Sequence, residues 1–123
     1  MRDMTVRSSD DAADALALLA TEWFKTARRL SRLTQEVAPA RLERERAQLA
    51  YSQRRVEETL EKQGIRLVTH DGTPFSTEIP AEPVNPEDFD TEEGLVVSET
   101  IEPTVICNGK ILARGLVVLA KGN

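Results

Sequence analysis

The sequence predicts an α+β fold: a long helical hairpin that forms a dimeric four-helix bundle, followed by a small C-terminal β-domain. Three observations support this prediction. Apolar residues recur at helical spacing in the first half and alternate at strand spacing near the C-terminus. Basic residues concentrate in the first half, whereas the stretch from Leu67 to Gly109 contains ten acidic residues and no lysine or arginine. We therefore expect two domains, a helical dimerisation region in residues 1–63 and a β-rich head in residues 64–123.

Composition and charge exclude several classes of protein. The net charge of −5 disfavours general nucleic-acid binding, and no run of about 18 apolar residues is present that would span a membrane. The N-terminus lacks the basic start and long apolar region of a secretory signal, and Asp10, Asp11 and Asp14 argue against one. Cys107 is the single cysteine and cannot form an internal disulfide. We therefore expect a protein of the reducing cytoplasm without a membrane span.

The first helix is expected from Ser9 to Val37. Ser8 or Ser9 would serve as its N-cap, because a serine hydroxyl can accept a hydrogen bond from a free backbone N–H of the first turn. The aspartates that follow suit the positive end of the helix dipole. The apolar positions repeat every three or four residues, so one face of this helix needs a partner; they are Leu16, Leu19, Trp23, Ala27, Leu30 and Leu33.

The second helix is expected from Pro39 to Gln63. Pro39 suits the first turn of a helix, and Gly64 is a favourable residue for ending one. Because each helix has one apolar seam, two copies of the chain would bury both seams in a bundle. The residues that we expect at the dimer interface are Leu16, Leu19, Trp23, Leu30, Leu49, Val56 and Leu60.

After Gly64 the pattern changes to that of short strands. The letters IRLV (65–68) and GLVVSETI (94–101) predict strands. The proline- and acid-rich segment between residues 76 and 94 predicts a connection that either wraps the surface or is partly mobile. The strongest local signal is TVIC and KILARGLVVLA on either side of Asn108-Gly109, a pair that favours a type I′ hairpin turn. We expect the even-numbered positions of the last strand to face the core, namely Leu112, Leu116 and Val118.

No apparatus for catalysis is visible in the sequence. His70 is the only histidine and is expected to be a polar turn residue, and Cys107 is expected to be a buried small side chain without a base near it. The acidic residues between 78 and 93 lack the spacing of a calcium loop, and no glycine-rich phosphate loop is present. The sequence therefore predicts a binding protein rather than an enzyme, with no metal and no cofactor.

The order of motifs from Leu60 onward resembles the GrpE family of nucleotide exchange factors. The chain carries LEKQGIRLV, then GTPF, an acidic spacer, GLVVSETIEP and NGKILARGLVVL, in the order in which that family has its helix-to-strand junction, its G-x-P-F motif and its closing strands. The residues that carry the resemblance are Gly64, Ile65, Val68, Gly72, Pro74, Phe75, Val97, Glu99, Lys110, Ile111, Leu112 and Val117.

The resemblance implies a cytoplasmic, homodimeric co-chaperone of protein folding and the stress response. Such factors bind the nucleotide-binding domain of a DnaK-type chaperone and release its ADP, and they bind neither nucleic acid nor membrane. It also implies that a β-rich head carries the partner contacts. In this chain the corresponding candidates are Lys110, Arg114, Asn108, Gly109 and Glu99.

Two other functions remain open at the level of sequence. One is a dimeric adaptor or scaffold that keeps the same fold without exchange activity. The other is an RNA-binding helical module, for which the positive side chains would be Arg41, Arg44, Arg46, Arg54 and Arg55.

Overall fold

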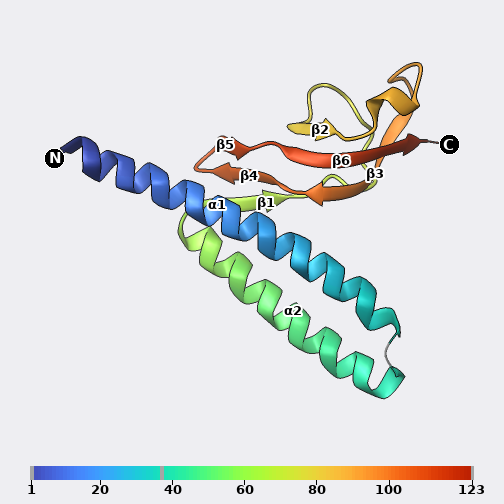
Figure 1. The fold of residues 1–123 in the computed structure, drawn as a ribbon, viewed down its shortest axis with the longest axis horizontal. Coiled ribbons are helices and arrows are strands. Elements are labelled where there is room, and N and C mark those ends of the chain that lie inside the picture. The colour runs from blue at the N-terminus through green and yellow to red at the C-terminus, as the bar shows by residue number, and fades with distance from the viewer. Residues whose placement is uncertain (1, 37, 123) are drawn as a thin grey trace. The chain divides into compact units, whose positions relative to one another are not determined.

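A computed structural model describes residues 2–36 and 38–122, with side chains from residue 11 onward. The chain divides into two compact units, residues 1–66 and residues 67–123. The first unit contains the helices and the second contains most of the strands (Figure 1).

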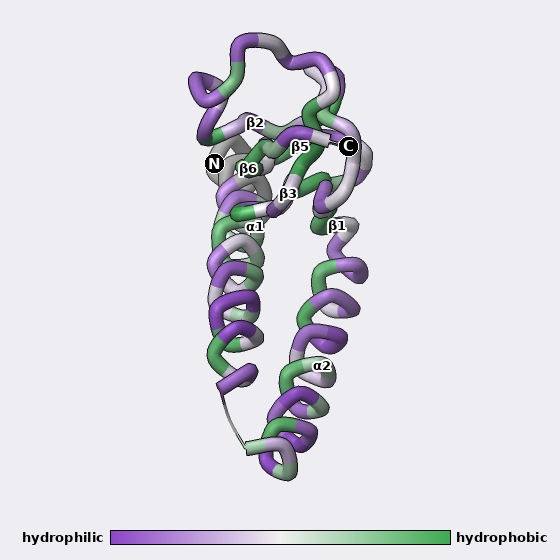
Figure 2. Tube along the Cα trace, turned by 90° about the vertical axis from the view of Figure 1, so that its right-hand side faces the viewer, coloured by the Kyte–Doolittle hydropathy of each residue, from purple (hydrophilic) through white to green (hydrophobic). Residues whose placement is uncertain are grey.

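The first unit consists of two helices with a short connection. Helix α1 spans Arg2–Leu33, the 3-10 turn η1 spans Thr34–Glu36, and helix α2 spans Pro39–Lys62. The two helices lie side by side (Figures 1 and 2). Proline begins α2, as expected, and Gly64 follows its end with a φ of 75°, a left-handed conformation that glycine adopts at little cost.

The prediction of a long helical hairpin in a dimeric four-helix bundle is wrong. The described residues form one helix of 32 residues and one of 24, followed by two small sheets. A heptad-like repeat shows that a helix has an apolar face, but not how many helices pack on that face. Ser8 and Ser9 lie within α1 and cannot be its N-cap, because the helix begins at Arg2. Val37, the expected end of the first helix, lies outside the described residues.

Helix α1 buries small residues and exposes large ones. Ala17, Ala20 and Ala27 are among the most buried residues of the first unit. Leu18 and Leu19, in contrast, are 63% and 66% exposed. Figure 2 shows hydrophilic and hydrophobic residues interspersed along both helices.

The β-structure consists of two three-stranded sheets. One has the order β1-β4-β5, with β1 at Ile65–Val68, β4 at Thr104–Cys107 and β5 at Lys110–Ala113. The other has the order β2-β6-β3, with bounds Ala81–Pro83, Gly115–Lys121 and Leu95–Glu102 for β2, β6 and β3.

The four C-terminal strands form one long bent hairpin. Strand β3 passes into β4 at Pro103, β5 passes into β6 at Arg114, and the turn between the two arms is Asn108-Gly109. Both turn residues have positive φ values, 50° and 84°, as the type I′ prediction requires. Within this hairpin β3 pairs antiparallel with β6, and β4 pairs antiparallel with β5.

The segment from 76 to 94 contains more structure than its sequence predicts. It holds strand β2, which runs parallel to β6, and the 3-10 turn η2 at Pro86–Asp88. The backbone N–H of Val84 donates to the carbonyl oxygen of Val117 at 2.9 Å. The expectation of a surface or partly mobile connection was therefore incomplete, because a strand of three residues with a proline leaves almost no periodic signal.

The core of the second unit is formed by residues of β2, β3 and β6, which are neighbours in one sheet. Its buried residues are Ala81, Leu95, Val97, Val117 and Leu119. The odd-numbered positions of β6 thus face the core.

The prediction that Leu112, Leu116 and Val118 form the core face is wrong. All three are only half-buried. Strand alternation shows which residues share a face, but when both faces carry apolar residues it does not show which face is buried.

We predict that Gly115→Ala lowers the free energy of unfolding by about 1–3 kcal/mol, the usual cost of forcing extra volume into a packed site. A Cβ atom at this position would lie 2.9 Å from the Glu102 carbonyl oxygen and 3.0 Å from Thr104 Oγ1, and the first of these is backbone that cannot rotate away. Urea unfolding followed by circular dichroism measures the change.

The control is Gly109→Asn. A Cβ atom there meets nothing within 4 Å, and asparagine tolerates positive φ better than most residues, so the loss is below about 1 kcal/mol. An unchanged midpoint for Gly115→Ala, or an equal loss in both variants, contradicts the packing argument.

Candidate partner-binding surfaces

The hairpin turn presents the first group of candidate contact residues. Asn108, Gly109 and Lys110 are consecutive and all exposed, so the structure brings these three together. Lys110 starts β5 and pairs with Cys107 across the hairpin. Next to it, Ile111 is 51% exposed. The turn therefore offers a cation beside an apolar side chain.

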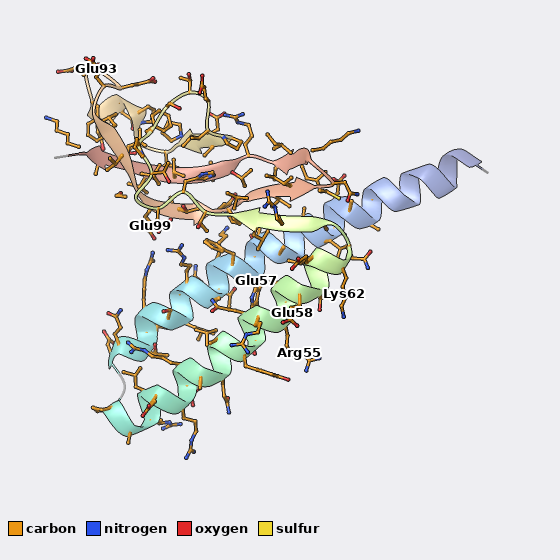
Figure 3. All side chains as sticks on the ribbon, turned by 180° about the vertical axis from the view of Figure 1, so that it is seen from behind. Arg55, Glu57, Glu58, Lys62, Glu93 and Glu99 are labelled. Carbon is orange, nitrogen blue, oxygen red and sulfur yellow. The ribbon has the colours of Figure 1, made fainter. Side chains whose placement is uncertain are left out.

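Arg114 lies at the other end of β5. Its Nε donates to Glu82 Oε1 of β2 at 2.8 Å, and the two side chains are 47% and 59% exposed. An exposed ion pair of this kind contributes about 0–1 kcal/mol to stability, so a partner could displace it at low cost. Arg114 lies four positions after Lys110 in the sequence, or about 13 Å away along an extended chain. Glu99 is half-buried on β3, in the other sheet (Figure 3). Neither residue belongs to the cluster at the turn.

The second candidate surface is the helical seam, the line along which α1 and α2 face each other. One hollow of about 390 Å³ is lined by Leu16, Leu19, Ala20, Trp23, Arg55, Val56, Thr59 and Leu60. A second hollow of about 210 Å³ is lined by Trp23, Leu30, Thr34, Glu45, Gln48, Leu49 and Ser52.

All seven residues expected at a dimer interface line the helical seam. Trp23 borders both hollows, of which the first is mainly apolar and the second is lined largely by polar side chains. At the first hollow, Arg55 of α2 (Figure 3) donates from Nη1 to the hydroxyl of Tyr51 at 3.3 Å and lies over that ring. The seven residues lie among those that line the two hollows, because helical periodicity places them on one face of each helix, and their role at a dimer interface stays a prediction.

A buried polar cluster in the second unit was missed by sequence reasoning. His70 is 6% exposed, and its Nε2 lies 2.8 Å from Thr104 Oγ1. The Thr104 hydroxyl donates to the carbonyl oxygen of Pro80 at 2.6 Å, while the backbone N–H of His70 donates to Thr100 Oγ1 at 2.9 Å. The expectation that His70 is a solvated turn residue is therefore wrong. Its hydrogen-bonding partners come from strands 30 and more residues away, which local composition does not reveal.

The hydrogen bonds of this cluster fix the tautomer of His70. A carbonyl oxygen can only accept, so the single proton of the Thr104 hydroxyl points to Pro80. Nε2 of His70 must then carry a proton and donate to Thr104. Burial lowers the pKa of His70 below its ordinary value of 6.5, and the Asp71 carboxylate acts in the opposite direction.

Other chemistry is not apparent in the part of the chain that the structure describes. No group of three or more histidine, cysteine, aspartate or glutamate side chains is placed to hold a metal ion there. Neither described helix combines the length and the apolar character of a membrane span. Cys107 is free and half-buried, not fully buried as expected.

Comparison of the chain with protein-family models, with curated proteins and with solved structures gives no match.

We predict that the free energy of unfolding falls as the pH drops below 6.5, in part through His70. Its pKa is lower in the folded protein, so above pH 6.5 the side chain is neutral in both states and imposes no cost. Between pH 6.5 and the lowered folded pKa, the unfolded chain binds the proton more readily, and stability is lost. Urea unfolding between pH 5 and pH 7.5 measures the slope.

The matched control is His70→Gln. The Gln side-chain amide can donate to Thr104 as Nε2 does, yet it does not titrate. The stability of this variant is expected to vary less with pH over this range than that of the native chain. Parallel pH profiles for the two proteins would exclude a contribution from His70.

Proposed function

We propose that this protein is a cytoplasmic nucleotide exchange factor of the GrpE kind, acting on a DnaK-type chaperone. The observation that carries the proposal is the long bent hairpin of β3 to β6, whose turn presents Asn108, Gly109 and Lys110. This turn offers an exposed cation in a unit that is otherwise strongly acidic. The order of motifs along the chain, which resembles that family, supports the same reading.

The mechanism needs no catalytic group. An exchange factor binds the open form of the nucleotide-binding domain more tightly than the closed form, and ADP leaves from the open form. The population can shift only by the difference between the two affinities, and each tenfold difference corresponds to about 1.4 kcal/mol. The rigid two-residue turn suits this task, because little conformational entropy is lost when it binds.

We predict that the protein accelerates release of a fluorescent ADP analogue from the DnaK-type chaperone of the same cell. Lys110→Ala is expected to raise the protein concentration needed for half-maximal acceleration about fivefold or more, since hydrogen-bonded charges at interfaces contribute at least about 1 kcal/mol to binding. The matched control is Lys121→Ala, which removes another exposed lysine near the far end of β6.

Three outcomes of this assay distinguish an exchange factor from the alternatives. Acceleration that Lys110→Ala reduces and Lys121→Ala leaves unchanged supports the proposal. Binding to the chaperone without faster release would identify an adaptor instead. No binding at saturating protein would refute the exchange function.

Self-association through the helical seam accompanies this proposal. The exposed Leu19 and the first hollow, beside Trp23, would be covered when two copies meet. We predict that Leu19→Glu lowers the mass measured by light scattering at micromolar concentration from that of a dimer to that of a monomer. The control is Leu18→Glu, a neighbouring leucine of nearly equal exposure that does not line either hollow. A monomer mass for the native chain would refute self-association.

A further inference from the structure

We propose that a hollow in the second unit binds an arginine side chain of a partner protein. This hollow, which we call the β6 hollow, has a volume of about 230 Å³. It is lined by Pro83, Pro86, Phe89, Asp90, Thr91, Glu92, Leu95 and Leu119. The site does not depend on the proposed exchange function, because it involves none of the residues at the hairpin turn.

The walls of the β6 hollow are held in place by a clamp at Asn85. Its side chain accepts from the backbone N–H of Leu119 at 2.9 Å and donates to the carbonyl oxygen of the same residue at 3.1 Å. At the other end of the segment, the N–H of Gly122 donates to the carbonyl oxygen of Gly94 at 2.8 Å. Both ends of the 85–94 segment are thus tied to β6 or to the residue that follows it. The hollow is therefore formed before a ligand arrives, which lowers the entropic cost of binding.

The hollow is backed by the core of the unit. Leu95 and Leu119 lie behind it and are 4% and 3% exposed, so they support its wall but offer a ligand little surface. Phe89 packs partly buried against that core and contributes an aromatic ring to the hollow. The accessible parts of Pro83, Pro86 and Phe89 suit the methylene groups of a long side chain, and an aromatic ring also attracts a cation placed over its face.

The charge at the hollow selects a cation. Asp90 and Glu92 line it, both are exposed, and no salt bridge within the described residues engages either carboxylate. The adjacent Glu93 (Figure 3) adds to the negative field, which Lys121, the cross-strand partner of Leu95, offsets in part. An aromatic ring with carboxylates near it matches an arginine side chain, whose planar guanidinium both stacks on aromatic rings and pairs with carboxylates.

The test is a titration of the isotope-labelled full chain with N-acetyl-arginine methylamide, followed by NMR of the backbone amides. The shifts are expected to concentrate at residues 89–95 and at Leu119, with weak saturable binding. N-acetyl-alanine methylamide, which has neither the stem nor the charge, is expected to produce none of these shifts. Methylguanidinium, which has the charge without the stem, is expected to bind more weakly than the arginine derivative.

Two variants with the same chemical change provide the decisive comparison. Glu92→Gln is expected to weaken binding about two- to fivefold, the range for one exposed ion pair. Glu78→Gln removes another exposed carboxylate that does not line the hollow, and it is expected to change nothing. Equal effects of the two variants, shifts spread over all acidic residues, or no shifts at all would each overturn the proposal. Failure of ADP release would leave this result untouched, so the two proposals are tested separately.

Discussion

The architecture of the second unit depends on one buried hydroxyl group. Thr104 is fully buried, donates to the carbonyl oxygen of Pro80, and accepts from Nε2 of His70. It thereby joins the segment after β1, the approach to β2 and the start of β4. A residue without a side chain must lie against it, and Gly115 fills that position. Because the side chains of Thr104 and His70 are shielded from water, the loss of one partner would leave the other unsatisfied, at a cost larger than that of an exposed hydrogen bond.

Local signals in the sequence predicted the local elements. The type I′ turn at Asn108-Gly109 follows from the need for two positive φ values, and the limits of α2 follow from Pro39 and Gly64. The apolar face of each helix was also predicted from the spacing of its apolar residues. The number of helices in a bundle was not, because periodicity in one chain carries no information about the partner of an apolar face.

The features that the sequence did not reveal depend on contacts between distant segments. His70 becomes a core residue only because Thr100 and Thr104 are brought to it by the fold. Asn85 precedes a proline, a combination that favours a turn, but only the structure shows that its side chain hydrogen-bonds both backbone groups of Leu119. The β6 hollow was hidden for the same reason, since its acidic residues resemble an ordinary solvated loop. Of the expected partner contacts, Asn108, Gly109 and Lys110 form one surface, while Arg114 and Glu99 lie elsewhere.

The parallel pairing of β2 with β6 has a consequence for the order in which the second unit assembles. The arms of the bent hairpin are close in sequence, so the chain loses little loop entropy when they pair. Strand β2 pairs with β6 across a larger separation in sequence, since Ala81 and Gly115 are paired and lie 34 positions apart. We therefore expect the hairpin to form first during folding and the hydrogen bonds between Asn85 and Leu119 to form late. By the same reasoning these hydrogen bonds are among the first contacts to open in the native protein, so hydrogen exchange at Val84 and Leu119 would be faster than in the middle of the hairpin.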